Sequence, residues 1–161
     1  MTQRQNTRNR TTQMGVLLLA QQLFAAGPIP PITFAFIMAQ IGIYTGFIPP
    51  LDPFFTRDFC LLPRAIIKNK QWYRLLIPVF MHADDWHLYY NMISLLYKGK
   101  TLERHLGSSK FVSIILALVI LTPLIHLIIA VGLDKLMAMP RFLNECTVGF
   151  SGKYISKPEI I

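Results

Sequence analysis

The sequence predicts an all-α, polytopic helical membrane protein, and three observations lead to this fold class. Hydrophobic residues make up 53% of the 161 residues and charged residues only 15%, whereas soluble domains carry about 25% charged residues. The mean hydropathy is +0.43. Two stretches, 11–51 and 111–133, contain no Asp, Glu, Lys or Arg, and each exceeds the roughly 20 apolar residues that one bilayer crossing needs. This composition excludes intrinsic disorder, and two cysteines are too few for a disulfide-built mini-protein.

The N-terminal part of the chain is divided by the run GPIPP at 27–31, which cannot continue a helix. After this run, 32–48 is predicted to be the first span. Before it, 14–31 is predicted to be an interfacial or re-entrant segment, because its apolar part is short and interrupted by two glutamines. A signal peptide over 14–26 is the alternative, since arginines precede a VLLLA run and small residues follow it.

The rest of the chain is read in the same way. A loop rich in proline and basic residues leads to an apolar helix, and a long uncharged run follows it. We therefore expect a first loop at 49–86, a second span at 87–104 and a third span at 111–133. The start of a fourth span is expected at 149–152, and a divergent tail at 153–161.

The net charge of +8 comes from basic residues that flank the apolar runs. This placement is typical of membrane topology signals, and we expect no nucleic-acid binding. If the three spans alternate, the basic tail at 1–13 and the basic cluster after the second span lie on one side, which the positive-inside rule makes cytosolic. The residues concerned are Arg4, Arg8, Arg10, Lys98, Lys100, Arg104 and Lys110. The N-terminus is then cytosolic and the first loop faces the lumen or the exterior.

Three polar side chains lie in or beside the second span, where polar groups are costly and mark functional sites. They are His82, His87 and Asn91, and the last two share one helix face because they are four residues apart. The alternative is an ordinary helix N-terminus, in which Asp84 or Asp85 caps the helix and the histidines bond backbone carbonyls. The spacing of these residues matches no zinc pattern, so we expect no metal site.

The tetrapeptide GFSG at 149–152 places Ser151 between small residues. A serine becomes a nucleophile only when a base takes its proton and donors stabilise the oxyanion. By itself the tetrapeptide is equally consistent with a loop or a helix-packing turn.

These motifs together resemble the rhomboid intramembrane serine proteases over residues 14–152. The pattern His82-x4-His87-x3-Asn91 comes before the GFSG tetrapeptide, and Gly99-x3-Glu103-x3-Gly107 looks like the second-helix motif of that family. Arg74 matches the arginine of the first-loop Trp-Arg signature, although a tyrosine stands where tryptophan is usual.

The resemblance implies a six-helix core with a water-filled cavity, in which a Ser–His dyad cleaves transmembrane substrates. Ser151 is then the nucleophile, and the side chains of His87 and Asn91 form the oxyanion hole with the Ser151 backbone N–H. His82 is expected to order the loop before the second helix. The resemblance gives structural roles to Arg74, Gly99, Glu103, Gly107, Gly149 and Gly152. It implies no cofactor, and it points to the endoplasmic reticulum as the host membrane.

The family's general base is a histidine on the sixth helix, and residues 152–161 contain no histidine. The chain is therefore expected to be the N-terminal part of a rhomboid protease and to be inactive by itself. A non-catalytic rhomboid-like protein that binds membrane clients for quality control or degradation is the alternative. A disulfide between Cys60 and Cys146 and two separate thiols both remain open at this stage.

Overall fold

The computed structural model describes residues 2–47, 56–149 and 153–155, and most of them are helical. The long helices are α1 (Thr2–Ala25), α2 (Pro31–Tyr44), α6 (Asp85–Leu106) and α7 (Ser108–Met137). The short ones are α3 (Thr56–Phe59), α4 (Pro63–Asn69), α5 (Tyr73–Leu76), η3 (Ile77–Phe80) and η4 (Pro140–Leu143). Two strands, β1 (Cys146–Val148) and β2 (Lys153–Ile155), form an antiparallel pair.

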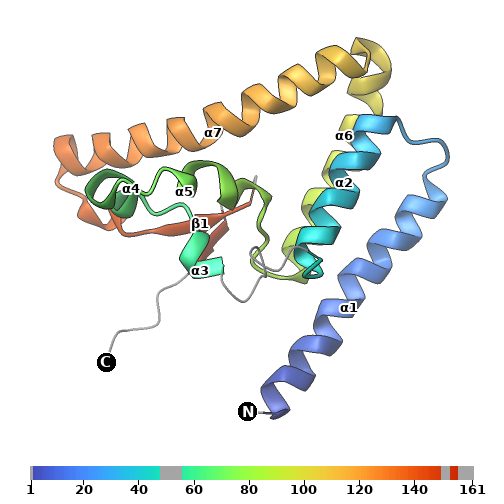
Figure 1. The fold of residues 1–161 in the computed structure, drawn as a ribbon, viewed down its shortest axis with the longest axis horizontal. Coiled ribbons are helices and arrows are strands. Elements are labelled where there is room, and N and C mark those ends of the chain that lie inside the picture. The colour runs from blue at the N-terminus through green and yellow to red at the C-terminus, as the bar shows by residue number, and fades with distance from the viewer. Residues whose placement is uncertain (1, 48–55, 150–152, 156–161) are drawn as a thin grey trace.

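Helices α1, α2 and α6 lie side by side as one layer (Figure 1). Their shared core is apolar and fully buried, with Leu19 from α1, Ile37 from α2 and Leu88 from α6 at its centre. Helix α2 starts with Pro31, which suits the first helical position because that position needs no N–H donor. Helix α6 of this layer carries His87 and Asn91, which the sequence pattern singles out.

Helix α7 turns away from this layer after Gly107 and runs over α4 and α5 (Figure 1). Gly107 has a φ of +80°, a conformation that residues with a Cβ rarely adopt. Phe111, Ile115 and Val119 of α7 pack against Val79 of η3. Among the described residues, α7 is the helix that is long and apolar enough to cross a bilayer by length and composition, while 14–25 and 31–44 are shorter apolar helices.

The structure refines several predicted segments. The helix predicted as the second span, α6, begins at Asp85 and ends at Leu106, and the helix predicted as the third, α7, covers Ser108–Met137. Both helices are longer than the predicted 87–104 and 111–133. The first loop is not irregular throughout, because it contains α3, α4, α5 and η3. Residues 153–155 of the predicted divergent tail form β2. The start of a fourth span at 149–152 lies outside the described residues, apart from Gly149.

The N-terminal part differs more from the prediction. The basic segment 1–13 is not a separate tail, because α1 runs without a break from Thr2 to Ala25. Helix α1 also runs in the same direction as α6, so that its N-terminal half extends past the Asp85 end of α6 (Figure 1). The two basic sets therefore do not lie at the same end of this layer. The prediction placed both sets on one side because it counted 32–48 as the first segment to traverse the layer.

Candidate active site

The first turn of α6 holds His87 in one orientation. The Asp84 side chain caps the helix by accepting a hydrogen bond from the His87 backbone N–H at 2.8 Å. Nδ1 of the His87 ring accepts the Ala83 backbone N–H at 3.2 Å. Since an accepting nitrogen carries no hydrogen, the neutral ring bears its hydrogen on Nε2. From the sequence, an Asp84 cap is the alternative to a functional site. The structure contains this cap together with a His87 ring that carries its hydrogen on Nε2.

Gly149 lies against this donor. A Cβ at Gly149 would stand 2.6 Å from Cε1 and 2.8 Å from Nε2 of His87, and the residue has a φ of +77°. Both the contact and the backbone conformation require glycine here. The first residue of the GFSG tetrapeptide is therefore packed on the Nε2 side of His87. Ser151 and Gly152 lie outside the described residues.

The strand that leads to Gly149 is held at several points. Cys60 and Cys146 form a disulfide with a Cα–Cα distance of 5.5 Å, which settles the pairing that the sequence left open. Leu61 and Thr147 exchange two backbone hydrogen bonds of 2.9 and 3.1 Å. The Gly149 N–H then donates to the Pro78 carbonyl at 2.8 Å. The direction in which the chain leaves β1 is thereby fixed.

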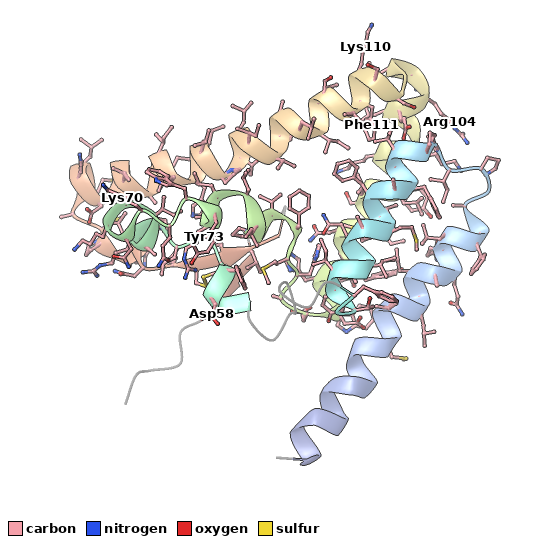
Figure 2. The ribbon with its side chains drawn as sticks, in the orientation of Figure 1. Asp58, Lys70, Tyr73, Arg104, Lys110 and Phe111 are labelled. Atoms are coloured by element: carbon pink, nitrogen blue, oxygen red, sulfur yellow. A yellow bond between two sulfur atoms is a disulfide. The ribbon has the colours of Figure 1, made fainter. Side chains whose placement is uncertain are left out.

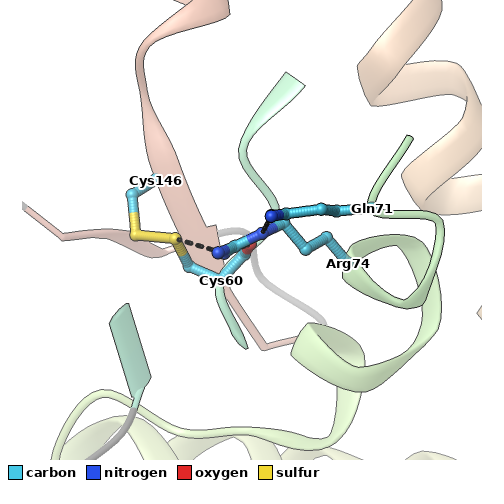
Figure 3. Close-up of a disulfide and its surroundings, with 4 residues drawn as sticks. All are labelled: Cys60, Gln71, Arg74 and Cys146. Carbon is cyan, nitrogen blue, oxygen red and sulfur yellow. Dashed lines mark hydrogen bonds between the residues drawn. A yellow bond between two sulfur atoms is a disulfide. The ribbon is translucent and has the colours of Figure 1, made fainter. Parts of the chain in front are cut away.

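Arg74 supports the disulfide from α5. Its Nη1 donates to the Cys60 carbonyl at 2.9 Å, and its Nε donates to Oε1 of Gln71 at 2.6 Å (Figure 3). The side chain is buried, so these bonds replace the water that a guanidinium requires. Arg74 is thereby connected to β1 through the Cys60–Cys146 disulfide.

Asn91 lies one turn after His87 on the same face of α6. Its Nδ2 is buried and has no hydrogen-bond partner among the described residues. The side chain lines a groove of about 340 Å³ between α6, α2 and α7, with Phe36, Ser94 and Phe111 among the other lining residues. Figure 2 shows the Phe111 side chain below α7 beside α2. Asn91 thus offers an unused donor, although neither His87 nor Gly149 lines the same groove.

His82 lies just before α6 and is buried with a relative exposure of 2%. Its ring packs edge-on against the His87 ring, with 5.1 Å between the centroids. Burial and the neighbouring His87 lower the pKa of His82 to about 3, so the ring is neutral at physiological pH. No hydrogen-bond partner of either ring nitrogen is found in the described part of the chain. His82 therefore contacts the candidate site through its packing against the His87 ring.

The glycines and Glu103 of the second-helix motif lie at the far end of α6. Glu103 accepts hydrogen bonds from the Ile32 and Thr33 backbone N–H groups at 3.0 and 2.7 Å, and from the Thr33 and Ser108 hydroxyls at 2.8 and 2.7 Å. A Cβ at Gly99 would meet Oγ1 of Thr33 at 2.8 Å. These residues join α6 to α2 and are remote from His87.

One polar residue near the site was not predicted from the sequence. His126 of α7 lines a cavity of about 40 Å³ together with Pro78, Thr147 and Gly149. The sequence shows that this histidine lies near the middle of a long apolar run, which is unusual. It does not show which side of α7 faces β1. No cluster of three or more His, Cys, Asp or Glu side chains suited to a metal occurs among the described residues.

The comparisons with known proteins agree with these motifs. The Rhomboid domain model matches residues 69–156, more than half of the chain. Rhomboid-related protein 4 of Homo sapiens is 40% identical over 147 residues, which cover 90% of this chain and 45% of the relative. Rhomboid-like protein 14, mitochondrial, of Arabidopsis thaliana is 37% identical over 76% of this chain and 37% of its own length. Rhomboid protease GluP of Bacillus subtilis is 31% identical over 55% of this chain and 18% of its own length. No solved structure matches.

Proposed function

Because this chain belongs to the rhomboid family, we propose that it carries the nucleophile and oxyanion donors of an intramembrane serine endopeptidase that cleaves transmembrane proteins. The chain spans about half the length of the curated relatives it matches first. The proposal therefore covers what these residues contribute to such an enzyme. The observation that carries it is the contact of Gly149 with the Nε2 side of His87.

In the proposed reaction the Ser151 hydroxyl attacks the scissile carbonyl, and negative charge develops on the carbonyl oxygen. The Nε2–H of His87, the Nδ2–H of Asn91 and the Ser151 backbone N–H stabilise that charge. This role is supported by the hydrogen bond from Ala83 to Nδ1, which leaves the hydrogen on Nε2. Removal of one such donor typically slows acyl transfer by about 10²–10³-fold.

Proton removal from Ser151 requires a base that residues 152–161 do not supply, since they contain no histidine. We propose that the 161 residues by themselves do not cleave. General-base catalysis contributes about 10²–10⁴-fold.

We further propose the endoplasmic reticulum as the host membrane and transmembrane proteins as substrates. The disulfide supports an oxidising compartment on one side of the membrane. Co-localisation of the tagged protein with an endoplasmic reticulum marker tests this assignment, and a mitochondrial pattern would contradict it.

The test of function starts with sequencing of the transcript beyond codon 161 and uses the complete protein that it encodes. We expect this protein to cleave a transmembrane reporter in cells, and Ser151→Ala to abolish the cleavage. Ser113→Ala is the matched control, because Ser113 is exposed on α7 and should be dispensable. A stop codon at 162, or cleavage that is unchanged by Ser151→Ala, would favour the client-binding alternative.

A further inference from the structure

Three contacts fix how α1 lies along α6. The Gly15 backbone N–H donates to the Asp85 carboxylate, the Tyr97 hydroxyl donates to Oε1 of Gln22 at 3.4 Å, and the Lys100 ammonium donates to the Ala26 carbonyl. Residue numbers rise together in both helices along this series. The two helices are therefore parallel and in contact along most of the length of α6 (Figure 1).

The two ends of α6 have the residue types of opposite membrane interfaces. Beside Asp85, the rings of Trp86, Tyr89 and Tyr90 pack together with centroids 5.3 to 6.1 Å apart, and aromatic residues of this kind gather at interfaces. The other end carries Lys98, Lys100 and Arg104. Since Gly15 meets the aromatic end and Ala26 the basic end, α1 extends from one interface to the other.

Helix α1 is part of the layer and not a segment lying on its surface. Leu19 is fully buried and belongs to the core shared with α2 and α6. A Cβ at Gly15 would stand 2.7 Å from Oδ2 of Asp85, so α1 approaches α6 too closely for any larger residue. At the basic end, Arg104 donates to the Pro28 carbonyl at 2.6 Å and lies beside the connection from α1 to α2 (Figure 2).

We infer that α1 is a further membrane-crossing helix, parallel to α6, and that the residues before Gly15 lie on the same side of the bilayer as the Cys60–Cys146 disulfide. Helix α1 stays in contact with α6 from the Asp85 end to Lys100, so it reaches both faces of the layer that α6 reaches. This arrangement replaces the cytosolic N-terminus that the arginines predict. It depends on α6 crossing the membrane, and not on the proposed proteolysis.

Cysteine accessibility tests the inference. The two cysteines of the sequence are joined to each other, so one added cysteine supplies the one reactive thiol. Three variants are compared in sealed vesicles with a membrane-impermeant maleimide, before and after permeabilisation. Gln5→Cys reports the N-terminal part of α1, Lys68→Cys in α4 reports the disulfide side, and Ser109→Cys reports the basic end of α6. Lys68 and Ser109 are both exposed.

We expect the labelled fraction of Gln5→Cys before permeabilisation to equal that of Lys68→Cys and to be the complement of that of Ser109→Cys. Equality with Ser109→Cys would show that α1 does not cross, and would overturn the inference. An intermediate fraction would also overturn it, because it requires two orientations of the N-terminus.

Discussion

Near the candidate site, a glycine and a histidine ring from distant parts of the chain lie close together. A Cβ at Gly149 would collide with Cε1 and Nε2 of the His87 ring, so its missing side chain is what lets this residue approach α6. The His87 ring is in turn oriented by one backbone donor, at Ala83. At this scale the site depends on one absent Cβ and one hydrogen bond.

Gly149→Ala is expected to displace either the His87 ring or the GFSG segment, because the added Cβ would lie 2.6 Å from Cε1. In the complete protein, reporter cleavage should fall by about 10²-fold or more, the loss typical of one oxyanion donor. Gly27→Ala is the matched control, since Gly27 also has a positive φ, +65°, but has nothing within 4 Å of the added Cβ. Equal losses in both variants would assign the effect to backbone strain.

His82 predicts a dependence of stability on pH. Its pKa is about 3 in the folded chain, against an ordinary value of 6.5. Between these values the unfolded chain binds a proton that the folded chain does not, so the free energy of unfolding falls as the pH is lowered from 6.5. The slope is at most about 1.4 kcal/mol per pH unit. Denaturant titrations of the wild type and His82→Gln at several pH values measure it.

The His82→Gln variant should lose this part of the slope, whereas His105→Gln, which changes an exposed histidine, should keep it. Subtracting the variant curve from the wild-type curve removes the contribution of the carboxylates. Parallel curves for the wild type and His82→Gln would contradict the burial of a neutral His82.

At the scale of elements, the end of α6 caps the start of α2. Glu103 is 2% exposed and accepts two backbone N–H groups at a helix N-terminus, where a carboxylate is favoured by the helix dipole. Glu103→Gln places an amide NH₂ against those donors and should cost about 1–3 kcal/mol. Unfolding in detergent measures this cost. Lys110→Gln is the control, since Lys110 points away from the other helices (Figure 2), and a similar loss there would reject the cap.

The disulfide holds β1 against the segment before α4, across a sequence separation of 86 residues. Replacing both cysteines by serine should lower the free energy of unfolding by about 2–4 kcal/mol. Thermal unfolding under non-reducing conditions compares the double variant with the wild type. Mass spectrometry of a non-reduced digest checks the bond itself, and two separate peptides would contradict it.

The sequence predicted the apolar helices well and their partners poorly. Apolar runs locate α2, α6 and α7 to within a few residues, because hydrophobic periodicity and the flanking proline, glycine and charged residues mark where a helix begins and ends. Helix α1 was misread, since its apolar part is short and its polar half begins with arginines. Its contact with α6 depends on Gly15 and Asp85, which are far apart in sequence and carry no shared pattern.

At the scale of the whole molecule, the candidate site residues come from two parts of the chain that α7 separates in sequence. Helix α6 carries His87 and Asn91, and Gly149, the first residue of the GFSG tetrapeptide, follows β1. The His-x4-His-x3-Asn and GFSG motifs predict which residues belong together, because they resemble a known family. The position of His126 beside Thr147 and Gly149 could not be predicted, since it depends on how α7 lies over β1.

The most direct measurement is an experimental structure of the complete protein with a fluorophosphonate bound at the active serine. The account predicts a covalent bond to Ser151, with the phosphoryl oxygen about 2.7–3.1 Å from Nε2 of His87 and Nδ2 of Asn91. An adduct on another residue, or a phosphoryl oxygen directed away from His87 and Asn91, would contradict it.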